Sequence, residues 1–188
     1  MVKKIQENLR EVYSPQLLTN IGQPDIAIQP LRLWETSLFI RLRNEIESTA
    51  EHLVAKSGER KETIAHVLAK TLITRNRIQT LIARENGTFV GYLTLLFPKF
   101  ARLKGNAYLS MSVKASHRGK GIGSKLLSAA EDFGRSRNVR RMELEVFGEN
   151  ERAIKLYKKF GYAVEGTRKN AVVTENGFDD LVFMAKFL

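Results

Sequence analysis

The stretch SHRGKGIGSKLL (residues 116–127) decides the fold class of this chain, because a glycine-rich, positively charged segment passes there directly into an apolar run. Three glycines stand at alternate positions, with Arg118 in front of them and Lys120 between the first two. Glycines let backbone amides approach an anion closely, and the free amides and dipole of a first helical turn attract phosphate. The stretch therefore predicts a loop that binds a pyrophosphate against the start of a helix.

Other kinds of glycine-rich loop do not fit this spacing. A nucleoside triphosphate loop needs Gly-Lys-Ser or Gly-Lys-Thr after a glycine and four further residues, and neither Gly119 nor Gly121 is followed by it. A dinucleotide fingerprint places its third glycine three positions after the second, whereas Gly123 follows Gly121 by two. A plain connecting turn would leave the entropy cost of three glycines unexplained. What remains is a strand, an Arg-x-x-Gly-x-Gly loop beginning at Arg118, and a helix.

Apolar spacing around this loop predicts an alternation of strands and helices. Asn86-Gly87 lies between two β-rich runs and predicts a tight hairpin, and Gly161 stands where a helix should stop. The expected strands cover residues 25–32, 80–84, 88–97, 108–113 and 140–147, followed by two strands around Asn176-Gly177. The expected helices cover residues 35–54, 64–72, 122–137 and 150–160. This order predicts a mixed α/β layer fold.

Length and composition are those of one globular domain. The chain has 188 residues, 43% hydrophobic and 27% charged, and no apolar run approaches the roughly 20 residues that cross a bilayer. The N-terminal segment is charged and lacks the apolar core of a secretion signal, so we expect a cytoplasmic protein. Apolar residues show only a weak pattern over residues 1–24. We therefore expect an N-terminal arm there and a single domain over residues 25–188. The chain has no cysteine, and its three histidines lack metal-ligand spacing, so we expect no metal site.

The charge balance is strongly basic. There are 31 Lys and Arg residues against 20 Asp and Glu residues, which gives a net charge of +11. A field of that sign favours anionic partners such as nucleic acid, acidic protein surfaces or a polyphosphate. Nucleic-acid modules usually combine such charge with aromatic stacking groups, but most phenylalanines and tyrosines here fall at core spacing. Nucleic acid is therefore not the expected partner.

The stretch SVKASHRGKGIGSKLL (112–127), followed at the right distance by LEVFGENERAIKLYKKFGY (144–162), resembles the GCN5-related N-acetyltransferase (GNAT) family. The match runs from about Asp25 to Leu188. These enzymes move an acetyl group from acetyl-coenzyme A to an amine by direct transfer in a ternary complex. The resemblance implies a central, mixed, mostly antiparallel twisted sheet flanked by about four helices, with acetyl-coenzyme A as cosubstrate and no metal.

The resemblance also assigns the cofactor-binding residues. The pyrophosphate of coenzyme A would lie on the glycine loop, and the pantetheine arm would pair with the preceding strand, which splays from its neighbour. An amide near Val113 would then polarise the thioester carbonyl and stabilise the oxyanion that forms on attack. Asn150 would contact the cofactor and also suits a helix N-cap. The full set is Met111, Ser112, Val113, Arg118, Gly119, Lys120, Gly121, Ile122, Gly123, Ser124 and Asn150.

Tyr157 matches the family's tyrosine near the thioester sulfur, where a phenol can protonate the departing thiolate as a general acid. On spacing alone, a half-buried aromatic on a helix face is the preferred explanation of Tyr157. Many relatives carry a glutamate, the general base, about five residues before the last valine of the preceding strand. Tyr108 stands there in this chain, which leaves a water chain, Glu85, Glu149 or no dedicated base. His117 is expected to be a solvated loop histidine.

In this family the acceptor pocket is built by the first two helices with their loop, the strand before the glycine loop and the closing hairpin. Arg60 and Lys61 in that loop disfavour a polyamine and suit an amine that also carries a carboxylate, such as an amino acid or an acidic peptide terminus. Two other functions remain open: a catalytically weak regulatory module that binds coenzyme A, and a ribosome-associated protein acetyltransferase that uses the basic surface. The sequence also leaves a homodimer open.

Overall fold

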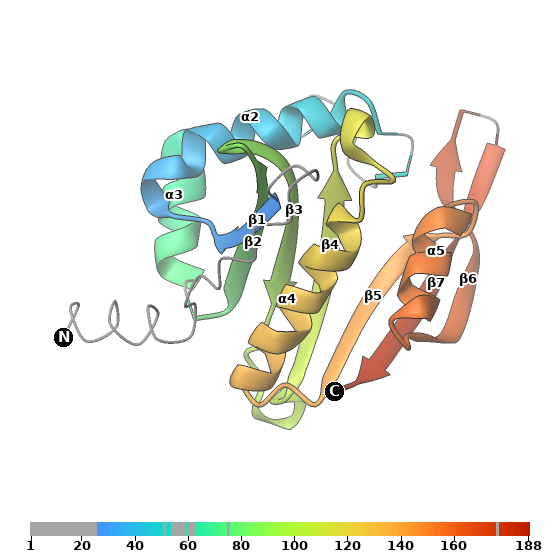
Figure 1. Ribbon diagram of the computed structural model, residues 1–188. Coiled ribbons are helices and arrows are strands. Elements are labelled where there is room, and N and C mark those ends of the chain that lie inside the picture. The colour runs from blue at the N-terminus through green and yellow to red at the C-terminus, as the bar shows by residue number, and fades with distance from the viewer. Residues whose placement is uncertain (1–25, 51, 54–58, 60–62, 75, 176) are drawn as a thin grey trace.

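One mixed seven-stranded sheet organises the protein (Figure 1). The computed structural model describes residues 26–50, 52–53, 59, 63–74, 76–175 and 177–188. The strand order is β1-β2-β3-β4-β5-β7-β6, and every neighbouring pair is antiparallel except β4 with β5. The strands are β1 (Ile26–Pro30), β2 (Ile78–Glu85), β3 (Thr88–Leu96), β4 (Asn106–Val113), β5 (Arg141–Phe147), β6 (Ala163–Thr174) and β7 (Gly177–Phe187). The predicted mixed, mostly antiparallel α/β fold is confirmed.

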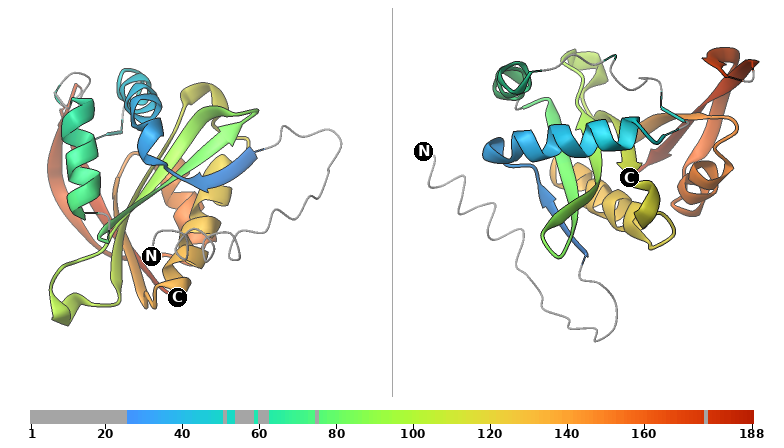
Figure 2. Two further views of the ribbon diagram at one scale, coloured as in Figure 1. Left: turned by 90° about the vertical axis from the view of Figure 1, so that its left-hand side faces the viewer. Right: turned by 90° about the horizontal axis from the view of Figure 1, so that it is seen from above.

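The α-helices of the described residues cover the two faces of this sheet (Figure 2). Ile82 of β2 packs with residues of α2, while its neighbour Leu81 packs with residues of α4. Successive strand residues point to opposite faces, so α2 and α4 lie on opposite sides of the sheet, and α5 shares the side of α4. The helices are α2 (Thr36–Glu47), α3 (Ile64–Thr74), α4 (Ile122–Ser136) and α5 (Glu151–Lys159). No helix of the described residues has both the length and the apolar character that a bilayer crossing requires.

Local sequence signals account for several element boundaries. Asn86 and Gly87 have φ angles of +50° and +81°, which the tight turn between β2 and β3 requires. The Asn150 side chain accepts a hydrogen bond from the Ala153 N–H over 3.1 Å and so caps α5. Gly161, at φ +85°, follows the end of that helix. The predicted hairpin, helix cap and helix stop are therefore confirmed.

The first helix is shorter than predicted. The sequence predicts a helix over residues 35–54, but α2 ends at Glu47. The hydroxyl of Ser48 donates to the Glu45 carbonyl over 2.9 Å, and that of Thr49 donates to the same carbonyl over 3.2 Å. These side chains satisfy a carbonyl of the last turn, so the chain can leave the helix there. The predicted arm over residues 1–24, most of the loop at 56–61 including Arg60 and Lys61, and Asn176 lie outside the described residues.

The sheet forks between β4 and β5. These two parallel strands pair only at their first residues, where Asn106 to Tyr108 face Arg141 to Glu143. Over residues 109–113, all of them described, β4 makes no pair with β5, and the ribbons diverge (Figure 1). β3 still pairs with β4 up to Val113. The expected splay of the strand before the glycine loop is therefore present, and it leaves one backbone edge of β4 open.

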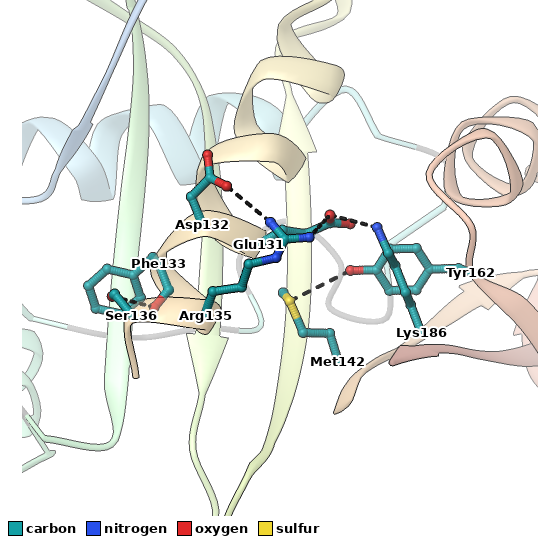
Figure 3. A network of polar contacts seen from close by, with 8 residues as sticks. All are labelled: Glu131, Asp132, Phe133, Arg135, Ser136, Met142, Tyr162 and Lys186. Atoms are coloured by element: carbon teal, nitrogen blue, oxygen red, sulfur yellow. Dashed lines mark hydrogen bonds and ion pairs between the residues drawn. The ribbon is translucent and has the colours of Figure 1, made fainter. Parts of the chain in front are cut away.

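A largely buried ion pair joins α4 to β7 (Figure 3). The Glu131 carboxylate of α4 lies 2.6 Å from the Lys186 ammonium of β7, and its side chain is 6% exposed. Arg135 of α4 also contacts Glu131 and pairs with Asp132. The hydroxyl of Tyr162 donates to the Met142 sulfur nearby, over 3.8 Å. The contact fixes α4, which carries the glycine loop at its start, to the strand layer of β7.

We expect Glu131→Gln to lower the free energy of unfolding by about 2 kcal/mol, because it leaves the largely buried Lys186 ammonium without its counter-charge. Asp132→Asn is the matched control, since its side chain is 73% exposed and pairs with the same arginine. That change should stay within about 0.5 kcal/mol. Urea unfolding of the three proteins measures both values. An equal loss of unfolding free energy in the two variants would show that burial of the ion pair does not contribute to stability.

Candidate active site

The glycine loop has the backbone conformation that its sequence predicts. Gly119 and Gly121 have φ angles of +86° and +76°, a region that glycine adopts without strain. Gly121 is the N-cap of α4, and no described side chain caps this helix start. The first bond of the helix runs from the Lys125 N–H to the Gly121 carbonyl over 3.1 Å. The amides of residues 122–124 precede that bond, so they point out of the helix start and can donate to an anion.

A cavity of about 660 Å³ opens between the start of α4 and the start of α5. Its wall combines the glycine loop, the end of β4, the first turns of α5 and residues that follow α2. Among the predicted cofactor-binding residues, those in the wall are Met111, Ser112, Val113, Arg118, Gly119, Gly121, Ile122, Gly123, Ser124 and Asn150. The fold thus gathers two sequence blocks, separated by one helix and one strand, around one space.

The backbone of Val113 faces the gap between β4 and β5. The N–H of the next residue, Lys114, donates to the Val90 carbonyl of β3 over 2.9 Å. Backbone groups of successive strand residues point to opposite sides, so the N–H and carbonyl of Val113 point away from β3. A hydrogen bond supports this orientation, since the Nε of Arg118 donates to the Val113 carbonyl over 3.4 Å. The cavity therefore has an amide donor from β4 at one end and the free amides of α4 at the other.

The sequence blocks that form this wall fall within residues 34–162, which match the model of the Acetyltransferase (GNAT) family. The chain belongs to this family. Its sequence is 32% identical to the L-amino acid N-acetyltransferase AaaT of Escherichia coli over 122 residues, which are 64% of this chain and 75% of that protein.

Solved GNAT structures share the fold. An acetyltransferase of the GNAT family from Streptococcus pneumoniae superposes with a TM-score of 0.82 at 21% identity, covering 87% of this chain and all of the other. The protein yncA of Salmonella typhimurium, solved with its cofactor acetyl-CoA, superposes with a TM-score of 0.76 at 22% identity. That alignment covers 87% of this chain and 94% of the other. The expected GNAT fold and family are therefore confirmed.

Tyr157 of this GNAT chain lies in the core behind the cavity and is not part of its wall. Its ring is 5.8 Å from the ring of Tyr162. Burial, and to a smaller extent the neighbouring Tyr108, raises the pKa of the Tyr157 phenol well above its usual value. The phenol is therefore protonated at neutral pH, which is the state that a general acid requires.

Lys120 is the other predicted site residue outside the wall. Its ammonium lies 3.9 Å from a carboxylate oxygen of Glu85, at the end of β2. The side chain is therefore directed toward Glu85, a residue 35 positions earlier in the chain. The Lys120 backbone still lies between two glycines of the loop, so its contribution to anion binding is that of an amide.

The prediction that His117 is a solvated loop histidine is wrong. Its side chain is 20% exposed, and its Nε2 lies 3.1 Å from a Glu85 carboxylate oxygen. Its Nδ1 lies 2.8 Å from the Ser116 hydroxyl. His117 also forms part of the cavity wall. Because the Glu85 carboxylate contacts His117, it stabilises the glycine loop and is not available as a free general base.

Several residues of the cavity wall were not predicted from the sequence. Arg152 lies across from the loop, with a guanidinium nitrogen 3.4 Å from where a Cβ on Gly119 would stand. His52 follows α2 and contacts Phe147 with ring centres 5.8 Å apart. Arg152 could have been found, because it lies in the first turn of the helix that Asn150 caps. His52 could not, since its contact with Phe147 joins segments 95 residues apart, which the sequence does not show.

Glu149, a candidate base from the sequence, lies in the wall on the turn between β5 and α5. The buried Asp179 of β7 accepts hydrogen bonds from the backbone N–H groups of Glu149, over 3.3 Å, and of Asp180, over 2.7 Å. This carboxylate fixes the turn that carries both Glu149 and Asn150. The sequence gives no sign of it, because Asp179 lies 30 residues away on another strand.

Proposed function

We propose that this GNAT enzyme transfers an acetyl group from acetyl-coenzyme A directly to the α-amine of an amino acid. One observation carries the proposal: a single cavity runs from the free amides at the start of α4 to the open backbone edge of β4. A pyrophosphate suits the first part and an extended amide-containing arm suits the second. Acetyl-coenzyme A contains both groups in one molecule.

The residues present fit this cosubstrate. A Cβ at Gly121 would meet no atom within 4 Å, so the loop backbone is open to a ligand there. Arg118 and Arg152 supply positive charge at the phosphate end. Amide donors, a helix dipole and cations together stabilise a pyrophosphate without a metal ion. A thioester supplies an acyl carbon that an amine can attack once its carbonyl is polarised.

Each residue then has a defined task in the transfer. The Val113 N–H donates to the thioester carbonyl and favours the charge that develops on its oxygen. Tyr157 holds a proton on its phenol and gives it to the departing sulfur. The loop and β4 fix the position of the thioester, so much of the rate enhancement comes from positioning.

The acceptor class rests on one relative and on one sequence feature. The matched Escherichia coli protein acts on L-amino acids, and Arg60 and Lys61 favour an acceptor that carries a carboxylate. A ribosomal protein terminus also presents an α-amine, but in a peptide that terminus has no carboxylate of its own. An amino acid is therefore the acceptor that we propose.

A thermal shift assay followed by a thiol release assay tests this function. We expect acetyl-coenzyme A and coenzyme A, but not ATP, to raise the melting temperature, because ligands that bind the folded state stabilise it. Thiol release with the twenty L-amino acids should then exceed release with polyamines. No shift with acetyl-coenzyme A would overturn the cofactor assignment. A shift without thiol release from any amine would favour a regulatory module that only binds coenzyme A.

A further inference from the structure

Polar side chains gather at the fork on the face of the sheet that carries α2. Tyr92 of β3 packs edge-to-face on Phe39 of α2, with ring centres 5.3 Å apart. Tyr92 stands opposite Ser112 of β4, so Ser112 shares this face. Alternation along the strand puts Tyr108 on the same face. Tyr108 therefore lies on the side of the sheet opposite α4, whose start forms the phosphate end of the cavity.

Glu145 of β5 lies on this face at the point where the fork opens. Tyr108 stands opposite Glu143 in the last pair that joins β4 and β5. Two residues further along, Glu145 points to the same face as Glu143, beyond the last pair. Its side chain is 26% exposed. The carboxylate is thus on the strand across the fork from the position where the family resemblance places a glutamate.

Arg168 of β6 reaches toward this carboxylate across the intervening strand. Its guanidinium stacks over the ring of Phe183 of β7, 5.5 Å from the ring centre. One terminal nitrogen lies 3.9 Å from a carboxylate oxygen of Glu145, and the side chain is 57% exposed. An exposed pair at that distance is weak, so a ligand can replace each partner at little cost. A negative and a positive group stand side by side on an open face.

Tyr108 connects this pair to the reacting end of the site. Burial raises the pKa of the Tyr108 phenol, the charge of Glu145 raises it further, and a hydrogen bond from the Glu145 backbone N–H opposes the shift. Tyr108 in turn raises the pKa of Tyr157. Tyr108 therefore interacts electrostatically with both Glu145 and Tyr157. Tyr108 stays protonated at neutral pH, so it cannot act as the missing base.

We infer that Glu145 and Arg168 form the acceptor site, in which Glu145 takes a proton from the ammonium of an amino acid and Arg168 binds its carboxylate. This inference rests on the proposed function. One ammonium proton passes to Glu145 and on to water, the nitrogen bonds to the acetyl carbon, and the carbon–sulfur bond breaks. Nitrogen loses its second proton to water as the amide forms, and Tyr157, which has given its proton to sulfur, takes one back from water, so each transfer releases one proton in net terms.

Among the described residues, several charged and titratable groups share the face of Glu145. They include Tyr108 of β4, Arg168 of β6, and Glu143 and Arg141 of its own strand, while β7 presents Phe183 opposite Glu145. Glu143 is engaged by Arg141, 3.1 Å away. Glu143 therefore provides a matched control: the same residue type on the same strand and face, with its own partner.

The test compares Glu145→Gln with Glu143→Gln in the full chain, using the L-amino acid that gives the fastest thiol release. We expect Glu145→Gln to lower kcat/KM for this acceptor about 50-fold at pH 7. The loss should shrink steadily as the pH rises toward the pKa of the amine, since free amine needs no base. Glu143→Gln should follow the wild-type profile. The melting shift with coenzyme A should be the same in all three proteins.

Arg168→Met tests the second half of the site. We expect KM for the amino acid to rise about tenfold, while KM for its carboxamide, which lacks the carboxylate, stays unchanged. The inference is overturned if Glu145→Gln and Glu143→Gln share one pH profile, or if Arg168→Met affects both acceptors equally. A wild-type protein that binds acetyl-coenzyme A but releases no thiol with any amine would instead overturn the proposed function.

Discussion

Tyr157→Phe lowers kcat for acetyl transfer about 1000-fold and leaves the Kd for acetyl-coenzyme A near the wild-type value, because only the proton for the leaving thiolate is lost. The phenol lies behind the cavity wall, and its raised pKa keeps it protonated at neutral pH. Phenylalanine retains the ring contact with Tyr162, so the core changes little. Stopped-flow thiol release measures kcat, and isothermal calorimetry measures Kd.

Tyr162→Phe is the matched control for this variant. Tyr162 belongs to the same core cluster, its phenol pKa is also raised, first by burial, and its hydroxyl donates to the Met142 sulfur. Removing that hydroxyl should affect stability but not kcat. Equal losses of kcat in both variants would indicate a structural effect, and full activity of Tyr157→Phe would assign protonation of the thiolate to another group.

The glycine loop and its surroundings were predictable because their signals are local. Gly119 and Gly121 need positive φ angles, Asn150 caps the helix that follows it, and Asn86-Gly87 closes a hairpin. Each of these depends on the chemistry of one or two neighbouring residues. The alternation of apolar and polar residues predicted the strands in the same way.

Contacts between distant segments were not predictable. Lys120 looks like a phosphate ligand in the sequence, but its ammonium turns to Glu85 on another strand. Glu145 alternates with apolar neighbours just as any solvent-facing strand residue does, and only the register of β4 with β5 shows that it stands at the fork. The family resemblance therefore indicated that Tyr108 stands where many relatives carry a glutamate, and the fold was needed to show which carboxylate lies across from it.

The second large effect concerns the loop backbone. We expect Gly121→Val to raise the Kd for acetyl-coenzyme A more than about 100-fold, because a β-branched residue at a φ of +76° costs roughly 1–3 kcal/mol and moves the amides of the loop. No protein atom limits this position, since a Cβ there would meet none within 4 Å. The effect would therefore arise from the backbone conformation and from the space that the side chain takes from the ligand, not from a clash within the protein.

Gly87→Val separates this effect from a general loss of stability. Gly87 has a φ of +81° and equally open surroundings, but it lies in the β2–β3 hairpin and not in the cavity wall. Both variants should lose similar melting temperature, and only Gly121→Val should lose the further rise that acetyl-coenzyme A produces. Differential scanning fluorimetry with and without acetyl-coenzyme A measures both quantities. If Gly121→Val keeps its ligand shift, the amides at the start of α4 do not bind the pyrophosphate, and the cofactor must lie elsewhere along the fork.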